Sequence, residues 1–130
     1  MRYEVIPLES LRHHEDFIEN NVRTLAYKIR SVATFTTPVC IDEKYRIILD
    51  GHHRAEALKR IGCRRVPAYL FSYPSEEVSV DVWEGCGRRS ITEQEIIEAV
   101  LSGKKFPPKT SRHIFHVERL KISIELAELY

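Results

Sequence analysis

The feature that most constrains the fold is a strand, a polar turn and a helix written within sixteen consecutive residues. The short apolar run 47–49 is typical of a buried strand, and Asp50-Gly51 interrupts it. From Arg54 onward, apolar residues recur at spacings that give a helix one buried face, and Gly62 is a natural helix stop. The sequence therefore predicts a carboxylate at the end of a strand and a polar turn at the start of a helix.

The chemistry of this turn suits an anion. A helix N-terminus presents free N–H groups and a partial positive charge. His52, His53 and Arg54 add further donors directly after Gly51, so the turn is a candidate cradle for phosphate oxygens. Asp50 is placed to face a metal ion or a substrate hydroxyl. A plain turn with exposed histidine and arginine side chains is an equally good interpretation of these five residues alone.

Composition excludes several classes of protein. A chain of 130 residues with 43% apolar and 30% charged residues predicts one domain, residues 1–130, with a modest core. No apolar stretch approaches the roughly 18 residues of a membrane span, and the N-terminus lacks the apolar run of a signal peptide, so we expect a cytoplasmic protein. A net charge of +1 argues against a nucleic-acid-binding surface.

Neither cysteines nor histidines predict a metal centre. The three cysteines occur without a CxxC motif, which favours buried thiols. The pairs His13-His14 and His52-His53 are adjacent residues whose side chains diverge, so neither pair forms a chelate, and we expect no metal ligands from the protein. Nucleotide-binding GxxxxGK[ST] and GxGxxG motifs are absent, and so is a GxSxG nucleophile.

Hydrophobic periodicity predicts an α+β domain with a small mixed sheet and about three helices. Thr92 and Glu95 form a capping-box pattern at the start of the third helix. Strands are expected over 3–8 (an edge strand), 39–41, 45–49, 65–71, 78–83 and near 117–126, the last with a short helical end. A hairpin turn is expected at 42–44, and helices are expected over 16–33, 54–61 and 92–103.

Two other segments carry reactive side chains. Cations, hydroxyls and an imidazole follow Pro107-Pro108 and suit phosphate binding, although a solvated basic loop is the simpler interpretation of that segment alone: Lys109, Thr110, Ser111, Arg112 and His113. Glu15, behind His13-His14, is a carboxylate between a loop and a helix, and alone it indicates little.

Taken together, these segments support a resemblance. The run 48–58 resembles the signature turn of the ParB/sulfiredoxin superfamily. Within it, the sequence Asp-Gly-His-His-Arg is similar to the corresponding motif of the archaeal free serine kinases. Residues 11–15 lie where that family has a His-Glu pair with the catalytic base. Residues 106–113 resemble its Pro-Lys-Thr-Thr-Arg-His motif, which contacts nucleotide phosphates, and the strand ending at Trp83 is similar to one near the amino-acid pocket.

The resemblance implies a single compact ParB/sulfiredoxin-like kinase domain. Such an enzyme transfers a phosphoryl group from ADP or ATP to the hydroxyl of free L-serine, with Mg²⁺ held mainly through the nucleotide phosphates. It implies that Glu15 is the base, that Asp50 orients the hydroxyl or shares that role, and that Trp83 borders the amino acid. The implied phosphate-binding residues are Gly51, His52, His53, Arg54, Lys109, Thr110, Ser111, Arg112 and His113.

Departures from related families leave some alternatives open. Only the predicted helix 92–103 stands where the archaeal kinases have a longer segment. His52 replaces the cysteine that sulfiredoxins need, and the Gly-Glu-Arg-Arg of ParB clamps is absent. The alternative function is a non-catalytic ParB-like nucleotide-binding regulatory or partition module. The sequence leaves open whether the donor is ADP or ATP and whether the acceptor is serine, threonine or homoserine. It also leaves open the oligomeric state, and whether Trp83 is a core residue or faces the substrate.

Overall fold

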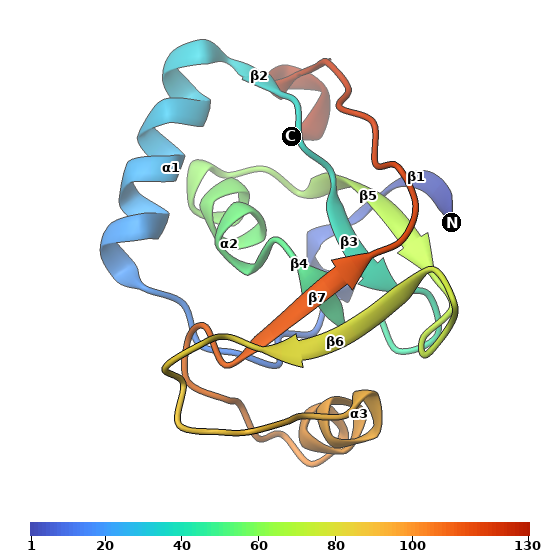
Figure 1. Ribbon diagram of the computed structural model, residues 1–130. Helices are drawn as coiled ribbons and strands as arrows, with labels where there is room; N and C mark the ends of the chain where they lie inside the picture. The colour runs from blue at the N-terminus through green and yellow to red at the C-terminus, as the bar shows by residue number, and fades with distance from the viewer.

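The computed structural model describes residues 1–130 and is built on a four-stranded mixed sheet (Figure 1). Its spatial order is β1 (Arg2–Pro7), β5 (Arg65–Phe71), β3 (Val39–Asp42) and β4 (Ile48–Asp50). β5 pairs antiparallel with β1 and parallel with β3, and β3 pairs antiparallel with β4. Two small two-stranded sheets complete the fold: β2 (Thr34–Phe35) with β8 (Ile124–Glu125), and β6 (Val78–Val82) with β7 (Ser111–Phe115).

The helices cover opposite faces of the mixed sheet (Figure 1). α1 (Glu19–Val32) and α2 (His52–Ile61) pack together on one face, whereas α3 (Glu93–Leu101) lies with the β6–β7 pair on the other. Short 3₁₀ turns occupy Leu8–Ser10 and Leu126–Leu129. None of the helices has the length and apolar character needed to cross a membrane.

β5 separates two hydrophobic cores. Because successive side chains of a strand point to opposite faces, Val66, Ala68 and Leu70 join the core beneath α1 and α2. Tyr69 and Phe71 point the other way, into the core beneath α3 and β6. β5 is therefore buried on both faces, and so is β4, which places Ile48 in the first core and Leu49 in the second.

Several sequence predictions are confirmed. β5 has the expected bounds, β1 is an edge strand, and the Thr92–Glu95 capping box is present at the start of α3. The expected small mixed sheet and three helices are present, so the α+β class is correct.

Others are wrong at their boundaries. α1 begins at Glu19 rather than at 16, because the backbone of Ile18 is extended and its N–H donates to the His53 ring instead. α2 begins at His52, two residues early, because Gly51 adopts a left-handed φ of 112° and turns the chain directly into the helix. The loop between β3 and β4 is longer than the expected 42–44 turn.

The C-terminal strand prediction is also wrong. Only Ile124–Glu125 forms a strand within 117–126, since this segment follows residues 33–36 with few backbone hydrogen bonds, such as Ile122 N–H to Thr36 O at 2.9 Å. Instead, β7 forms upstream at Ser111–Phe115, where the sequence analysis predicted no strand, because this segment pairs with β6.

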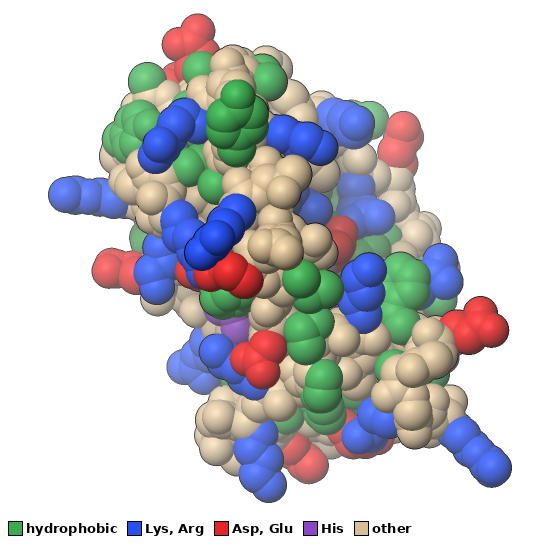
Figure 2. All heavy atoms as spheres, turned by 90° about the vertical axis from the view of Figure 1, so that its left-hand side faces the viewer, with side chains coloured by type: hydrophobic (Ala, Val, Ile, Leu, Met, Phe, Trp, Pro, Cys, Tyr) green, Lys and Arg blue, Asp and Glu red, His purple; other side chains and the backbone are tan.

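The surface on the α1 side carries mixed charge. Figure 2 shows Lys and Arg side chains interspersed with Asp and Glu on this face. Arg60 of α2, for example, forms ion pairs with Glu19 of α1 and Glu56 of its own helix.

Candidate active site

A cleft of about 270 Å³ collects all of the site residues proposed from the sequence except Thr110. It lies where the N-terminus of α2 meets β7 and the segment before it. Its lining consists of Glu15, Asp16, Leu25, Leu49, Asp50, Gly51, His52, His53, Arg54, Trp83, Lys109, Ser111, Arg112 and His113. Thr110 is buried behind the cleft, where its hydroxyl donates to Pro107 O at 2.7 Å.

The start of α2 forms one wall of this cleft. No side chain caps the helix, so its first-turn N–H groups, beginning with those of His52 and His53, have no intrahelical acceptor. Gly51 brings the backbone close to β3: a Cβ at this position would lie 2.7 Å from Val39 Cγ1. The wall therefore presents free backbone N–H groups, a geometry suited to an anion, at a turn whose close approach to β3 requires glycine.

Glu15 is positioned by backbone pairing rather than by a helix. Ile48 N–H donates to Arg12 O at 2.9 Å, so this stretch runs alongside the start of β4. Asp16 N–H donates to Phe106 O at 2.9 Å, which fixes the other end of the stretch to the segment before β7. The Glu15 side chain is thereby held between the two predicted phosphate-binding segments.

The Glu15 carboxylate is 7% exposed and accepts several hydrogen bonds. Thr110 N–H donates to Oε1 at 2.7 Å, Ser111 Oγ donates to Oε2 at 2.8 Å, and His14 Nε2 lies 3.2 Å from Oε2. Burial acts to raise the pKa of Glu15, but the hydrogen bonds from His14, Ser111 and Thr110 together outweigh it and lower the pKa. The carboxylate is thus ionised at neutral pH.

Four imidazoles form a cluster on one side of this carboxylate. His13 Nδ1 lies 2.9 Å from His52 Nδ1, the His14 and His52 ring centroids are 4.6 Å apart, and His14 lies 5.7 Å from His113. Burial lowers the pKa of His13 to about 4 and that of His113 to about 3, and it also lowers the pKa of His52. The rings of His13, His52 and His113 are therefore neutral at physiological pH.

His53 and Arg54 have partners within the protein. His53 Nε2 accepts the N–H of Ile18 at 3.0 Å, which leaves the proton of a neutral ring on Nδ1 as a donor. Arg54 donates to Pro38 O at 3.2 Å and lies 3.7 Å from Asp50 Oδ2. The His53 hydrogen bond links α2 to the residue before α1, and the contacts of Arg54 hold the turn between β4 and α2 in place.

The opposite wall carries exposed cations and an indole ring. Lys109 adopts a positive φ of 57°, which is unusual for a residue other than glycine and turns the chain at the cleft. The Arg112 guanidinium lies 5.1 Å from the centre of the Trp83 ring, in cation–π geometry. Trp83 is 42% exposed, so it faces the cleft and is not a core tryptophan.

Sequence reasoning missed Arg119. Its guanidinium donates to Asp50 Oδ2 at 3.0 Å and stacks on the Phe115 ring with its centre 4.0 Å away. Because Arg119 belongs to the segment expected to be a regular strand, nothing in its local pattern indicated a contact with the turn after β4. Asp50 is consequently paired with two arginines, Arg54 and Arg119.

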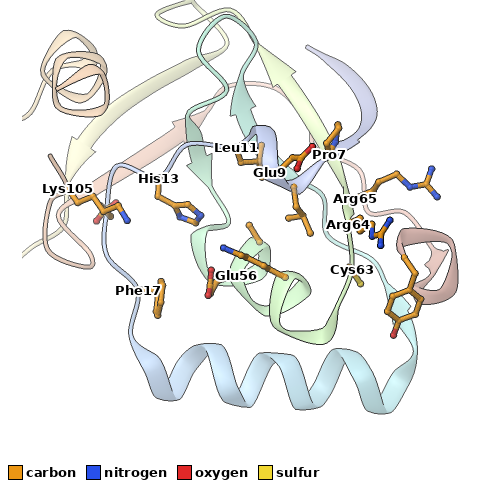
Figure 3. Close-up of a pocket in the computed structure, with 15 residues that line it drawn as sticks. Pro7, Glu9, Leu11, His13, Phe17, Glu56, Cys63, Arg64, Arg65 and Lys105 are labelled. Atoms are coloured by element: carbon orange, nitrogen blue, oxygen red, sulfur yellow. The ribbon is translucent and has the colours of Figure 1, made fainter. Parts of the chain in front are cut away.

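A second, larger cavity of about 1030 Å³ adjoins the cleft (Figure 3). Glu15 lines both cavities, and His13 lines this one. Its lining includes apolar side chains such as Leu11 and Phe17 and the cations Lys59 and Lys105. The histidine cluster therefore lies between two openings to solvent.

Comparison with known proteins first defines the class of fold. The chain has the fold of the free serine kinases: it is similar to a free serine kinase in complex with AMP, with a TM-score of 0.90 and 17% identity, over 98% of this chain and 93% of that one. This confirms the expected α+β fold of the free serine kinase type.

Sequence similarity then indicates particular relatives, although no family model matches the chain. It is 34% identical over 84 residues to an ATP-dependent L-serine kinase of Desulfurococcus mucosus, covering 61% of this chain and 32% of that protein. It is 27% identical over 85 residues to an ADP-dependent L-serine kinase of Thermococcus kodakarensis, covering 62% and 35%. The resemblance to free serine kinases is confirmed, and the chain spans about a third of the length of these relatives.

Proposed function

We propose that this protein is a small-molecule kinase that transfers a phosphoryl group from ADP or ATP to the hydroxyl of free L-serine, giving O-phospho-L-serine. The observation that carries the proposal is the cleft itself. A ready-made anion site at the start of α2 faces the cations Lys109 and Arg112, and the ionised carboxylate of Glu15 lies beside them. The similarity to L-serine kinases supports the same conclusion.

In this proposal, both walls of the cleft contribute donors to the phosphate groups. The first-turn N–H groups of α2 and the His53 Nδ1–H would bind phosphate oxygens from one side. Lys109 and Arg112 would close over them from the other, where charge-assisted hydrogen bonds are strongest. Phosphoryl transfer depends largely on such positioning and charge neutralisation. The remaining residues of the turn and of the segment 109–113 shape this phosphate site, among them Gly51, His52 and Arg54.

Glu15 acts as the base in the proposed reaction. The serine oxygen attacks the terminal phosphorus, the bond from that phosphorus to the departing AMP or ADP breaks, and the hydroxyl proton passes to Glu15. Its lowered pKa keeps the carboxylate unprotonated before the reaction, and Ser111 and Thr110 fix its orientation. A positioned general base contributes about 10²–10⁴-fold to the rate. Asp50, aligned by Arg119, orients the hydroxyl.

The amino acid is proposed to bind beside Trp83. The exposed indole borders the cleft, and Arg112 lies over its face. A small hydroxy amino acid fits a cleft of about 270 Å³ that already has to hold the terminal phosphate. The reaction then takes place between the Trp83 side and the start of α2.

The donor set of the cleft fits Mg²⁺. Mg²⁺ prefers oxygen ligands and retains several waters, and the Asp50 carboxylate, which is 45% exposed, can supplement the phosphate oxygens. Bound with the nucleotide, Mg²⁺ neutralises phosphate charge. The proposal includes residues 1–130 acting as one kinase domain and a cytoplasmic setting, where nucleotides and free amino acids are available.

Product analysis tests the function. The purified chain is incubated with Mg²⁺, either ADP or ATP, and L-serine, L-threonine or L-homoserine, and phosphorylated amino acids are quantified by mass spectrometry. We expect O-phospho-L-serine together with AMP or ADP in equal amount. Tight nucleotide binding without any phosphorylated amino acid would contradict the kinase proposal and favour a non-catalytic nucleotide-binding module.

A further inference from the structure

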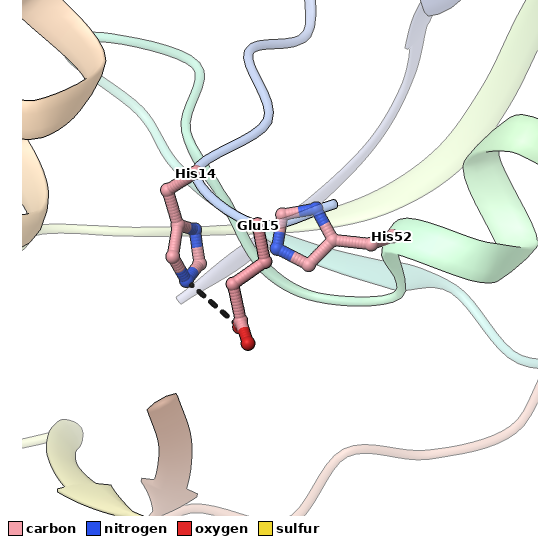
Figure 4. Close-up of side chains that lie close together, drawn as sticks. All are labelled: His14, Glu15 and His52. Carbon is pink, nitrogen blue, oxygen red and sulfur yellow. Dashed lines mark ion pairs between the residues drawn. The ribbon is translucent and has the colours of Figure 1, made fainter. Parts of the chain in front are cut away.

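The fold brings one histidine of each adjacent pair to the same carboxylate. His14, Glu15 and His52 lie close together, with the ring of His52 reaching from α2 toward the other two side chains (Figure 4). A nitrogen of each imidazole and a carboxylate oxygen all lie within 4.8 Å of one another. Adjacent histidines cannot chelate, but histidines from different pairs can, and the fold supplies this combination.

Two buried nitrogens in this cluster have no hydrogen-bond partner. His14 is 0% exposed and His52 is 9% exposed, yet His14 Nδ1 and His52 Nε2 are both unpaired. Buried polar atoms are normally paired, because leaving one unpaired costs about 1–3 kcal/mol. Unpaired imidazole nitrogens beside a carboxylate indicate a missing ligand that accepts their lone pairs.

The other ring atoms are held as metal ligands require. His52 Nδ1 lies 2.9 Å from His13 Nδ1, and in the tautomer in which His52 Nδ1 donates to His13 Nδ1, the lone pair of the His52 ring is on Nε2. Ser111 Oγ donates to Glu15, so it accepts from His14 Nε2 at 2.7 Å, and in the neutral form of the ring this arrangement places the lone pair on His14 Nδ1. Such outer hydrogen bonds orient metal-binding histidines in known sites.

We propose that His14, Glu15 and His52 form a binding site for a borderline divalent transition-metal ion, with Zn²⁺ as the best fit. Two imidazoles and one carboxylate are a recurrent Zn²⁺ donor set that leaves a coordination position open. Hard Mg²⁺ avoids imidazole nitrogen, so this site is separate from the Mg²⁺ that accompanies a nucleotide. The large cavity lined by His13 and Glu15 gives the ion a route from solvent.

An ion at this site changes what Glu15 can do. A carboxylate that coordinates Zn²⁺ cannot accept the proton of a substrate hydroxyl, so Zn²⁺ inhibits phosphoryl transfer. This consequence rests on the proposed kinase function, whereas binding of the ion does not. We therefore test binding without nucleotide or amino acid, and failure of the kinase proposal leaves the result interpretable.

Co²⁺ and Zn²⁺ titrations test the site. The full chain is treated with chelator and titrated with Co²⁺, whose visible absorption reports coordination number, and Zn²⁺ is then added in competition. We expect one ion per chain in a four- or five-coordinate spectrum, displaced by Zn²⁺ and not by Mg²⁺. His52→Gln and His14→Gln should weaken binding by more than the ~10–100-fold typical of losing an outer-shell partner. His116→Gln, at an exposed histidine, is the matched control.

Binding that persists unchanged in His52→Gln and His14→Gln, or no binding by the wild-type chain, overturns the proposal. A second measurement does not depend on the folding of any variant. Nitrogen NMR of the wild-type histidine rings should show that Zn²⁺ shifts the nitrogens of His14 and His52 and leaves His116 unchanged. Shifts confined to other histidines would place the ion elsewhere and contradict the site.

Discussion

Ser111 and Glu15, which lie 96 positions apart in the sequence, are joined by a buried hydrogen bond of 2.8 Å from Oγ to Oε2. The same hydroxyl lies 2.7 Å from His14 Nε2. One serine of β7 therefore fixes both the proposed base and the imidazole beside it, and it ties the C-terminal part of the cleft to the N-terminal part.

Ser111→Ala removes this link. We expect the free energy of unfolding to fall by about 1–3 kcal/mol, because the buried Glu15 carboxylate and His14 ring each lose a partner. Urea unfolding followed by circular dichroism measures the change. Ser79→Ala, which removes a half-buried hydroxyl of the paired strand β6 whose hydrogen bond to His116 is exposed to solvent, should change stability by less than about 0.5 kcal/mol. Equal effects of the two substitutions would contradict the structural role of Ser111.

Gly51→Ala tests the close approach of the turn to β3. The new Cβ would meet Val39 Cγ1 at 2.7 Å, and the backbone φ of 112° is strained for alanine, so we expect a loss of about 2–4 kcal/mol. Gly85→Ala is the control, since Gly85 also has a positive φ, 83°, but open space around it. Its cost should be about 1 kcal/mol. The difference between the two isolates the steric contact, and the absence of a difference would refute it.

The buried histidines predict loss of stability in mild acid. The unfolded chain binds protons below about pH 6.5, whereas burial lowers the pKa of folded His113 to about 3 and that of His13 to about 4. The unfolded state thus binds more protons in this window, and stability falls as pH falls from 6.5. Each excluded proton contributes a slope of about 1.4 kcal/mol per pH unit.

Urea unfolding between pH 7 and pH 5 measures this slope separately from that of Glu15. The lowered pKa of Glu15 stabilises the fold above its ordinary value of 4.5, and this contribution is lost only at lower pH. His113→Gln should flatten the slope between pH 7 and 5, and His116→Gln should not. A wild-type chain whose stability is constant over that range would show that the histidines are not buried as neutral rings.

Arg112→Ala should weaken nucleotide binding while leaving the fold intact. Arg112 is exposed and lies beside Trp83 on the wall opposite the start of α2, so its loss should remove a charge-assisted bond to phosphate worth about 1.5–3 kcal/mol, or ~10–100-fold in Kd. Calorimetric titration with ADP and ATP measures the change. Lys121→Ala removes an exposed cation that does not line the cleft and is the matched control. Unchanged affinity in Arg112→Ala would remove this residue from the phosphate cradle.

Local patterns in the sequence predicted local structure well. The strand-turn-helix unit around Gly51 and the capping box of α3 each depend on a few neighbouring residues, and both are present. The predicted start of α1 was wrong because the N–H of Ile18 donates a hydrogen bond to His53. These residues are 35 positions apart, so no local sequence pattern indicates the contact.

In the candidate site, too, local motifs were predictable from the sequence and long-range contacts were not. Three motifs nominated residues that do line one cleft, but their partnerships could not be predicted. The pairing of Arg119 with Asp50 and the grouping of His14 with His52 arise only from chain topology. The assignment of roles to Glu15 and to the phosphate-binding residues stays a prediction for the experiments above.

The rate of O-phospho-L-serine formation by wild-type protein and by Glu15→Gln, measured with the nucleotide affinity of both, tests the central claim most directly. Glutamine keeps the shape of the side chain and cannot accept the hydroxyl proton. The account predicts nearly unchanged nucleotide affinity and a turnover lower by about 10²–10⁴-fold in Glu15→Gln. Near-normal turnover in that variant would contradict it.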